Sequence, residues 1–172
     1  PDMELHVNND FGKIYDSNYC KGSFGSCMVD ENRTSFYHDS VKAKAAYIID
    51  KTGLIVARAI LFTDVTDQDG KKWRLLERQY SSEGDDVLKR LLVDKLVQED
   101  YIDGYKVIGA SCHDANSFVD VCGNSLSDRK FEIDCELELE DTLSYQDSFK
   151  WYSYSRNKAY NYENSGTSYN LD

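Results

Sequence analysis

Proline is almost absent from this 172-residue chain, which has only Pro1, so no proline-rich linker separates domains. Long apolar runs are also missing: no stretch approaches the ~20 residues of a transmembrane helix, and no signal peptide is visible. The length suits one domain over residues 1–172. Because the chain begins with Pro1 instead of Met, we interpret it as a fragment of a longer parent or a processed fusion.

Cysteine is present in an odd number and without regular spacing. The five residues are Cys20, Cys27, Cys112, Cys122 and Cys135. This pattern argues against the disulfide framework of a secreted domain and favours a reducing cytoplasm. Hydrophobic residues make up 41% of the chain, so we expect a core that needs neither metal nor disulfide.

Positive charge is scarce. The chain has 20 basic and 31 acidic residues, for a net charge of -11. Affinity for nucleic acids comes mainly from Lys and Arg on phosphates, and anionic membranes attract basic segments. We therefore expect neither nucleic acid nor membrane as a direct partner, and a protein with a basic surface as the favoured one. The sequence leaves the oligomeric state open.

The first 44 residues show little periodicity and are expected to form an irregular region of loop with short strands or one short helix. Residues 45–111 are better patterned: β-rich runs at 47–49, 54–63 and 73–80 are separated by turns at 50–53 and 67–70. Three strands joined by tight turns indicate an antiparallel meander. Arg58 lies alone among apolar residues, and we expect it to face a solvated or paired environment.

One amphipathic helix follows the meander. Ser82 and Asp85 have the spacing of a capping box. An apolar stripe then recurs every three or four residues, at Val87, Leu88, Leu91, Leu92 and Leu96. A fourth strand is expected over residues 106–111.

Residues 112–172 contain an acidic strand and an aromatic tail. Apolar and acidic residues alternate over 131–139, which predicts a strand with one buried face and one row of carboxylates, Glu132, Asp134, Glu136 and Glu138. The tail is rich in aromatics, including Trp151, Tyr152 and Tyr154, which either form an interface or close the core. The predicted fold class is α+β, a mostly antiparallel sheet with one main helix.

The order of elements over residues 45–111 resembles the core of the GNAT acyltransferase fold. This resemblance implies acetyl-CoA as cofactor, with its pyrophosphate at the N-terminus of the helix, near Ser81, Ser82 and Gly84. The family's loop is rich in glycine, whereas residues 78–86 contain one Gly and three carboxylates, which would repel pyrophosphate. Without the family's activity, no cofactor is expected.

A second resemblance covers more of the chain. Ser26-Cys27-Met28, the strand at 54–59 and Asp147-Ser148-Phe149-Lys150-Trp151 are similar to uncharacterised proteins of bacteriophages and mobile elements. The resemblance implies a phage or bacterial cytoplasm and no particular chemistry.

Cysteine chemistry gives two further hypotheses. Gly25-Ser26-Cys27 is similar to the motif around papain-type nucleophiles, with His38 or His113 as base, against the alternative of a packed small side chain. A zinc site would use Cys20, Cys27, Cys112 and Cys122, although zinc sites usually show shorter spacing within each pair.

Three functions therefore remain open. The first is an acidic interaction module, of phage origin if the second resemblance holds, that binds a basic protein through the acidic strand and the aromatic tail. The alternative is a GNAT-like acyltransferase with a degenerate cofactor loop. The third is an enzyme with Cys27 as nucleophile.

Overall fold

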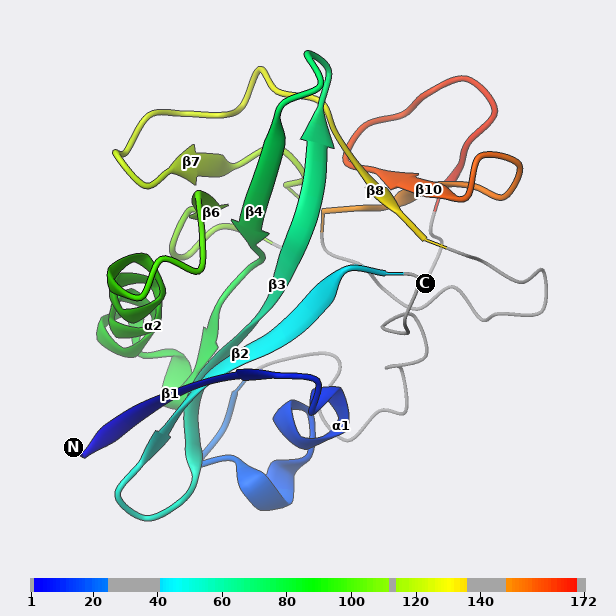
Figure 1. Cartoon of the computed structure of the whole chain (residues 1–172). Coiled ribbons are helices and arrows are strands. Elements are labelled where there is room, and N and C mark those ends of the chain that lie inside the picture. The colour runs from blue at the N-terminus through cyan, green and yellow to red at the C-terminus, as the bar shows by residue number, and fades with distance from the viewer. Residues whose placement is uncertain (1, 25–40, 112–113, 136–147, 170–172) are drawn as a thin grey trace.

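The computed structural model describes residues 2–24, 41–111, 114–135 and 148–169, and these segments form one large mixed sheet with two α-helices (Figure 1). All but one of the strand pairs are antiparallel in the described segments. The α+β class and the mostly antiparallel sheet are confirmed. None of the described helices is long and apolar enough to span a membrane.

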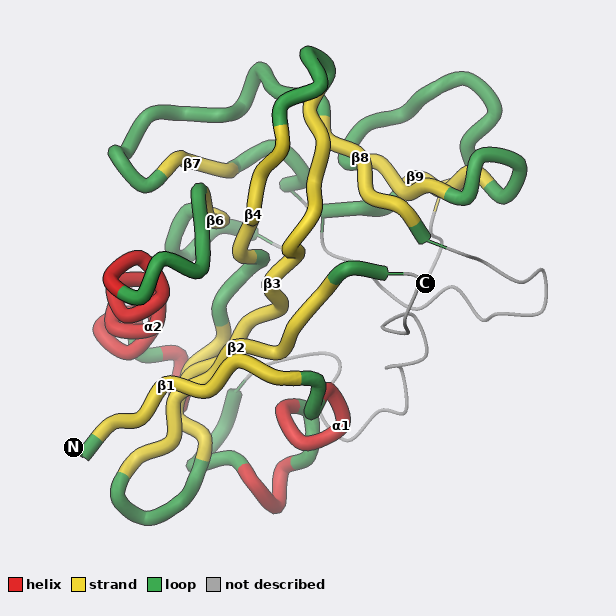
Figure 2. The backbone as a smooth tube through the Cα atoms, in the orientation of Figure 1, coloured by secondary structure: helices red, strands yellow, loops and turns green. Residues whose placement is uncertain are grey.

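The sheet is organised around β3 (Ile55–Asp67), which is thirteen residues long. One edge of β3 pairs with β2 (Ala43–Asp50) and, at its far end, with β8 (Phe131–Asp134). The other edge pairs with β5 (Tyr80–Ser81) and then with β4 (Lys72–Leu76). The predicted meander is thus present as β2, β3 and β4, and Figure 2 shows it running through the centre of the molecule.

The N-terminal region contains a strand, β1 (Met3–Asn8), which pairs with β2 along six residues. Its alternation is weak because all but one of its residues are only partly buried. After β1 come a short helix, α1 (Phe11–Ile14), and a 3₁₀ turn, η1 (Ser17–Tyr19). Asp16 accepts a hydrogen bond from the Asn18 N–H and so caps that turn.

The predicted helix is α2 (Asp86–Gln98), and its cap differs from the expected one. Asp85, and not Ser82, is the N-cap: its side chain accepts from the Val87 N–H at 2.9 Å. Ser82 lies instead in η3 (Ser82–Gly84), where Glu83 (φ 56°) and Gly84 (φ 68°) have left-handed backbones that end any helix there. The predicted capping box is therefore wrong, because the η3 turn separates Ser82 from the first residue of α2.

The chain after α2 returns as β6 (Gly104–Lys106), which lies parallel to β4 and antiparallel to β7 (Phe118–Asp120). The fourth strand was therefore expected two residues too late, and residues 107–111 are not strand. Asp103 fixes this return by accepting two hydrogen bonds from the Arg74 side chain and one from its N–H. These bonds lower the pKa of Asp103.

The last strands form a small extension of the sheet, in the order β8, β10 (Lys158–Tyr160), β9 (Trp151–Ser153) and β11 (Ser168–Tyr169). The expected acidic strand is present over Phe131–Asp134, and residues 136–139 lie outside the described residues. The expected edge strand over 149–152 begins two residues later, at Trp151, and is covered by β11.

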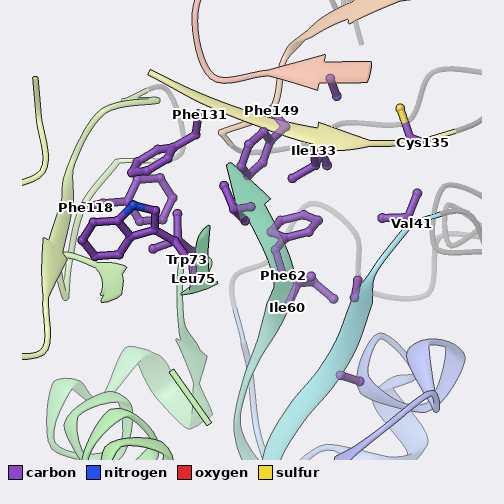
Figure 3. Close-up of a cluster of buried hydrophobic side chains, with 14 of the residues drawn as sticks. Val41, Ile60, Phe62, Trp73, Leu75, Phe118, Phe131, Ile133, Cys135 and Phe149 are labelled. Carbon is purple, nitrogen blue, oxygen red and sulfur yellow. The ribbon is translucent and has the colours of Figure 1, made fainter. Parts of the chain in front are cut away.

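The two faces of the sheet bury separate apolar clusters. Even-numbered Ile60 and Phe62 face one cluster, and odd-numbered Ala59 and Leu61 face the other, as the period of a strand requires. Side chains from α2 cover the second face, and α1 lies on the first (Figures 1 and 2). Figure 3 shows the first cluster, where aromatic rings meet edge to face: Phe62 with Phe149, Trp73 with Phe131, and Phe118 with Phe131.

Gly104 offers a direct test of the packing between β4 and β7. A Cβ at this position would lie 2.8 Å from the Val119 carbonyl oxygen and 2.9 Å from Leu75 Cδ2. We expect Gly104→Ala to lower the free energy of unfolding by about 1–3 kcal/mol, because backbone is too close for the neighbours to adjust. Urea unfolding measures the change.

Gly12→Ala in α1 is the matched control, since a Cβ there meets no atom within 4 Å. Ala is the better helix residue, so stability should stay equal or rise by up to about 1 kcal/mol. Equal stabilities of the two variants would contradict the packing at β6.

Candidate functional site

The solvent face of β8 carries the first residues of the predicted acidic row. Glu132 is half-buried, and the Asp134 side chain is 68% exposed. Lys158, on the neighbouring β10, places its Nζ 2.8 Å from Asp134 Oδ1 and 3.6 Å from Glu132 Oε2. The hydrogen bond with Asp134 raises the pKa of Lys158. The row is therefore partly neutralised where β8 is paired.

Glu136 and Glu138 lie outside the described residues. The sequence there has no basic residue: between Lys130 and Lys150 it carries only acidic charges, at positions 132, 134, 136, 138, 140, 141 and 147. Lys158 thus serves the two members of the row that belong to β8. Negative charge without a basic neighbour in sequence is concentrated in the segment that follows this strand.

The aromatic residues assigned to binding fall into two groups. Tyr152 is fully buried and belongs to the first apolar cluster, so it closes the core and does not reach the surface. Trp151, on β9, and Tyr154, which follows that strand, are half-buried. Both are separated from the acidic strand β8 by β10, and both are less buried than Tyr152.

The loop that the GNAT resemblance marked as a pyrophosphate site is occupied by the chain's own groups. Ser81 is fully buried, and its Oγ donates to the Asp85 carbonyl at 2.7 Å. The Asp85 carboxylate takes the Val87 N–H, which a pyrophosphate would otherwise approach.

A backbone strap also covers this loop. Ser23 accepts from the Glu83 N–H at 2.6 Å and donates its own N–H to Glu83 Oε1 at 2.9 Å. Gly22 passes so close that a Cβ on it would lie 3.0 Å from Ser82 Oγ. Ser82 and Gly84 therefore form a turn that is held by residues 22–23, next to two carboxylates.

The cysteine hypotheses are decided only in part. Cys27, Cys112, His38 and His113 lie outside the described residues. Cys20 bridges to Ile55 at the beginning of β3, and Cys122 is exposed in the turn after β7. Among the residues that the structure describes, no three His, Cys, Asp or Glu side chains are grouped to hold a metal.

A buried polar network that the sequence did not reveal joins the segment between β4 and β5, β6 and the segment before β9. Lys106 is fully buried, and its Nζ donates to Ser148 Oγ at 2.5 Å and lies 5.1 Å from the centre of the Phe118 ring. The Ser148 N–H donates to Glu77 Oε1 at 3.1 Å. Gln79 donates its amide to the Lys106 and Glu77 carbonyls, both at 3.0 Å.

This network contains a lysine beside a serine hydroxyl, an arrangement that can activate a nucleophile. Both side chains have no exposed area, however, so no substrate reaches them in this structure. Its effect is to tie Ser148 to β6 and to the segment between β4 and β5, which are distant in sequence. In the sequence, the only indication of this network is that two polar residues, Glu77 and Gln79, interrupt the predicted strand over 73–80.

Arg58 is another of the buried charged side chains; it is not solvated, and aromatic rings form its surroundings. The side chain is fully buried. Its guanidinium carbon lies 4.8 Å from the centre of the Phe24 ring, 4.9 Å from that of Tyr15 and 5.2 Å from that of Tyr80. Within the described parts of the chain, none of its three nitrogens has a hydrogen-bond partner.

Burial lowers the pKa of the Arg58 guanidinium, and Tyr15, Cys20 and Tyr80 oppose that effect. The three rings present their negative faces to the cation and supply part of the lost hydration. Aromatic rings do not replace the hydrogen bonds that the guanidinium makes with water. An anionic group that approaches the buried guanidinium would therefore be stabilised.

The chain matches no protein-family model, no curated protein and no solved structure.

The Lys106–Ser148 contact can be tested by a double-mutant cycle. Ser148→Ala removes the acceptor of the buried ammonium, and we expect it to lower the free energy of unfolding by about 1–3 kcal/mol. Lys106→Met in addition removes the charge and keeps the apolar stem. The double variant should therefore be more stable than Ser148→Ala alone, as measured by urea unfolding.

Proposed function

We propose that this chain is an acidic interaction module that binds a protein partner through a basic surface of that partner. The observation that carries the proposal is the unbroken acidic segment over residues 131–149, which begins on the solvent face of β8. Half-buried Trp151 and Tyr154 follow this segment in sequence and offer apolar contact area.

The distribution of charge supports the same function. Six charged side chains are buried in the described segments: Arg58, Lys106, Lys150, Asp50, Asp67 and Glu77. Their charges cancel, so the net charge of -11 is carried by other residues. A surface of this sign speeds the approach of basic partners and repels nucleic acids and anionic membranes.

The first two residues of the acidic row, Glu132 and Asp134, are partly neutralised by Lys158, and this affects where a basic partner binds most strongly. Lys158 already contacts Glu132 and Asp134, so a basic partner would have to compete with it on β8. Glu136 and Glu138 have no basic residue near them in sequence. We therefore assign the stronger contribution to the residues that follow Asp134.

Charge neutralisation tests this proposal. Asp134→Asn, Glu136→Gln and Glu138→Gln together should weaken binding of a fluorescent Lys-Ala repeat peptide about tenfold, since each exposed charge pair contributes about 0.2–1 kcal/mol. Fluorescence anisotropy measures the affinity, which should also fall with added salt.

The matched control removes three exposed carboxylates from α2 and its C-cap, with Asp86→Asn, Asp94→Asn and Glu99→Gln. It changes the net charge by the same amount at a different surface. Its affinity for the peptide should fall by less than about threefold. An equal loss in both triple variants would show that net charge alone drives binding and would remove the acidic segment as the contact.

A GNAT-like acyltransferase is the second candidate function. The parallel pairing of β4 with β6, with α2 between them, is the observation in its favour, since the resemblance depends on that order of elements. The Asp85 cap and the Glu83–Ser23 contacts argue against acetyl-CoA at the helix N-terminus, because they occupy its N–H groups and add negative charge.

Acetyl-CoA separates the two candidates. With the acidic module, we expect no change in melting temperature at millimolar acetyl-CoA. A ligand at about 100 times its Kd stabilises by about 2.7 kcal/mol, which corresponds to several degrees for a chain of this size. A rise of that size in the melting temperature with acetyl-CoA, but not with adenosine alone, would support the acyltransferase.

A further inference from the structure

The surroundings of Cys20 differ from those of the other two described cysteines. Cys20 follows η1, is half-buried, and packs at the edge of the first apolar cluster. Its backbone bridges to Ile55, and the Lys21 N–H donates to the Ile55 carbonyl at 2.9 Å, so the residue is fixed at the beginning of β3. The backbone of Cys20 is therefore fixed, and the residue is only half-buried.

Arg58 lies three residues further along the same strand and is held beside Cys20 by shared neighbours. Cys20 Sγ is 3.7 Å from the Ile14 carbonyl, and the next residue, Tyr15, stacks its ring on the guanidinium. Cys20 is one of the neighbours that oppose the lowering of the Arg58 pKa by burial. Among the described residues, the three Arg58 nitrogens have no hydrogen-bond partner.

We propose that Cys20 is a reactive thiolate, stabilised by Arg58, and a modification site for hydroperoxides. Two observations carry this: Cys20 is only half-buried, and the fully buried Arg58 cation beside it has no hydrogen-bond acceptor among the described residues. A neutral thiol is a weak acceptor and donates to the Ile14 carbonyl instead, whereas a thiolate supplies the negative charge that the guanidinium lacks. The inference does not depend on the proposed function.

Among the residues that the structure describes, the other charged and titratable groups around this site do not supply that negative charge. Tyr15 and Tyr80 are phenols, which are neutral near pH 7, and they contact Arg58 through their rings. Lys21 Nζ is bound to Asp50 Oδ2 at 2.7 Å, and this hydrogen bond lowers the pKa of Asp50. Glu83 is occupied by the Ser23 N–H.

The reaction follows from the chemistry of a thiolate. The Cys20 sulfur attacks the terminal oxygen of a hydroperoxide, so an S–O bond forms as the O–O bond breaks. The sulfur is oxidised by two electrons to a sulfenic acid, which keeps the hydrogen of that oxygen. The remaining oxygen leaves as hydroxide or alkoxide and takes a proton from water. The hydroperoxide is the only co-reactant.

Alkylation by iodoacetamide across pH 5.5–9 on the whole folded chain tests the thiolate, with each cysteine followed by peptide mass spectrometry. Exposed Cys122 is the internal comparator. We expect the rate at Cys20 to reach half its maximum at least one pH unit below that at Cys122, and to be about tenfold faster near pH 6.5. Cys135, whose pKa burial raises to about 12, should not react.

Substitution of Arg58 distinguishes the cation from mere exposure. Arg58→Met should move the Cys20 profile to that of Cys122, while Arg58→Lys, which keeps the charge, should move it by less. If Arg58→Met does not fold, the pH dependence of Cys20 alkylation in the unmodified chain and in Arg58→Lys still tests the proposal. Profiles that coincide for Cys20 and Cys122, or that do not change in Arg58→Met, would overturn the proposal.

Hydrogen peroxide with dimedone, which traps sulfenic acids, tests the modification itself. The Cys20 peptide should be labelled at least about tenfold faster than the Cys122 peptide at neutral pH. Equal labelling of the two peptides would reject the hydroperoxide site. Cys20→Ser should abolish the fast labelling and leave that of Cys122 unchanged.

Discussion

The backbone hydrogen bonds of β3 hold the sheet together. This strand pairs with β2, β8, β5 and β4, and both of its faces are buried. Its length permits this, because different parts of one edge serve β2 and β8, and different parts of the other serve β5 and β4. The two apolar clusters, α2 and the C-terminal extension all take their positions from this strand.

A strand that is buried on both faces should be apolar, and Arg58 interrupts it at a position where Tyr47 and Tyr80 lie directly across. Aromatic rings and the nearby Cys20 take the place of water around the guanidinium. Lys106 is accommodated differently, by one hydroxyl and one ring. Arg58 thus connects the core to the Cys20 site, and Lys106 connects it to the segment before β9.

β8, where the acidic segment begins, and Cys20 are held at opposite ends of β3. Cys20 bridges to Ile55, the first residue of the strand, whereas β8 pairs with Thr66 and Asp67 at its end. The thirteen residues of β3 are fixed by neighbouring strands on both edges.

The sequence by itself determined the class of fold, the meander, the helix and the start of the acidic strand, because alternation and the apolar stripe are local patterns. Only the tertiary structure decided the pairing of β1, the Asp85 cap, the burial of Tyr152 and the environments of Arg58 and Lys106. Each of these depends on residues distant in sequence. A charged side chain in an apolar strand is equally compatible with solvent and with an aromatic cage, and only the packing of Tyr15, Phe24 and Tyr80 selects the cage.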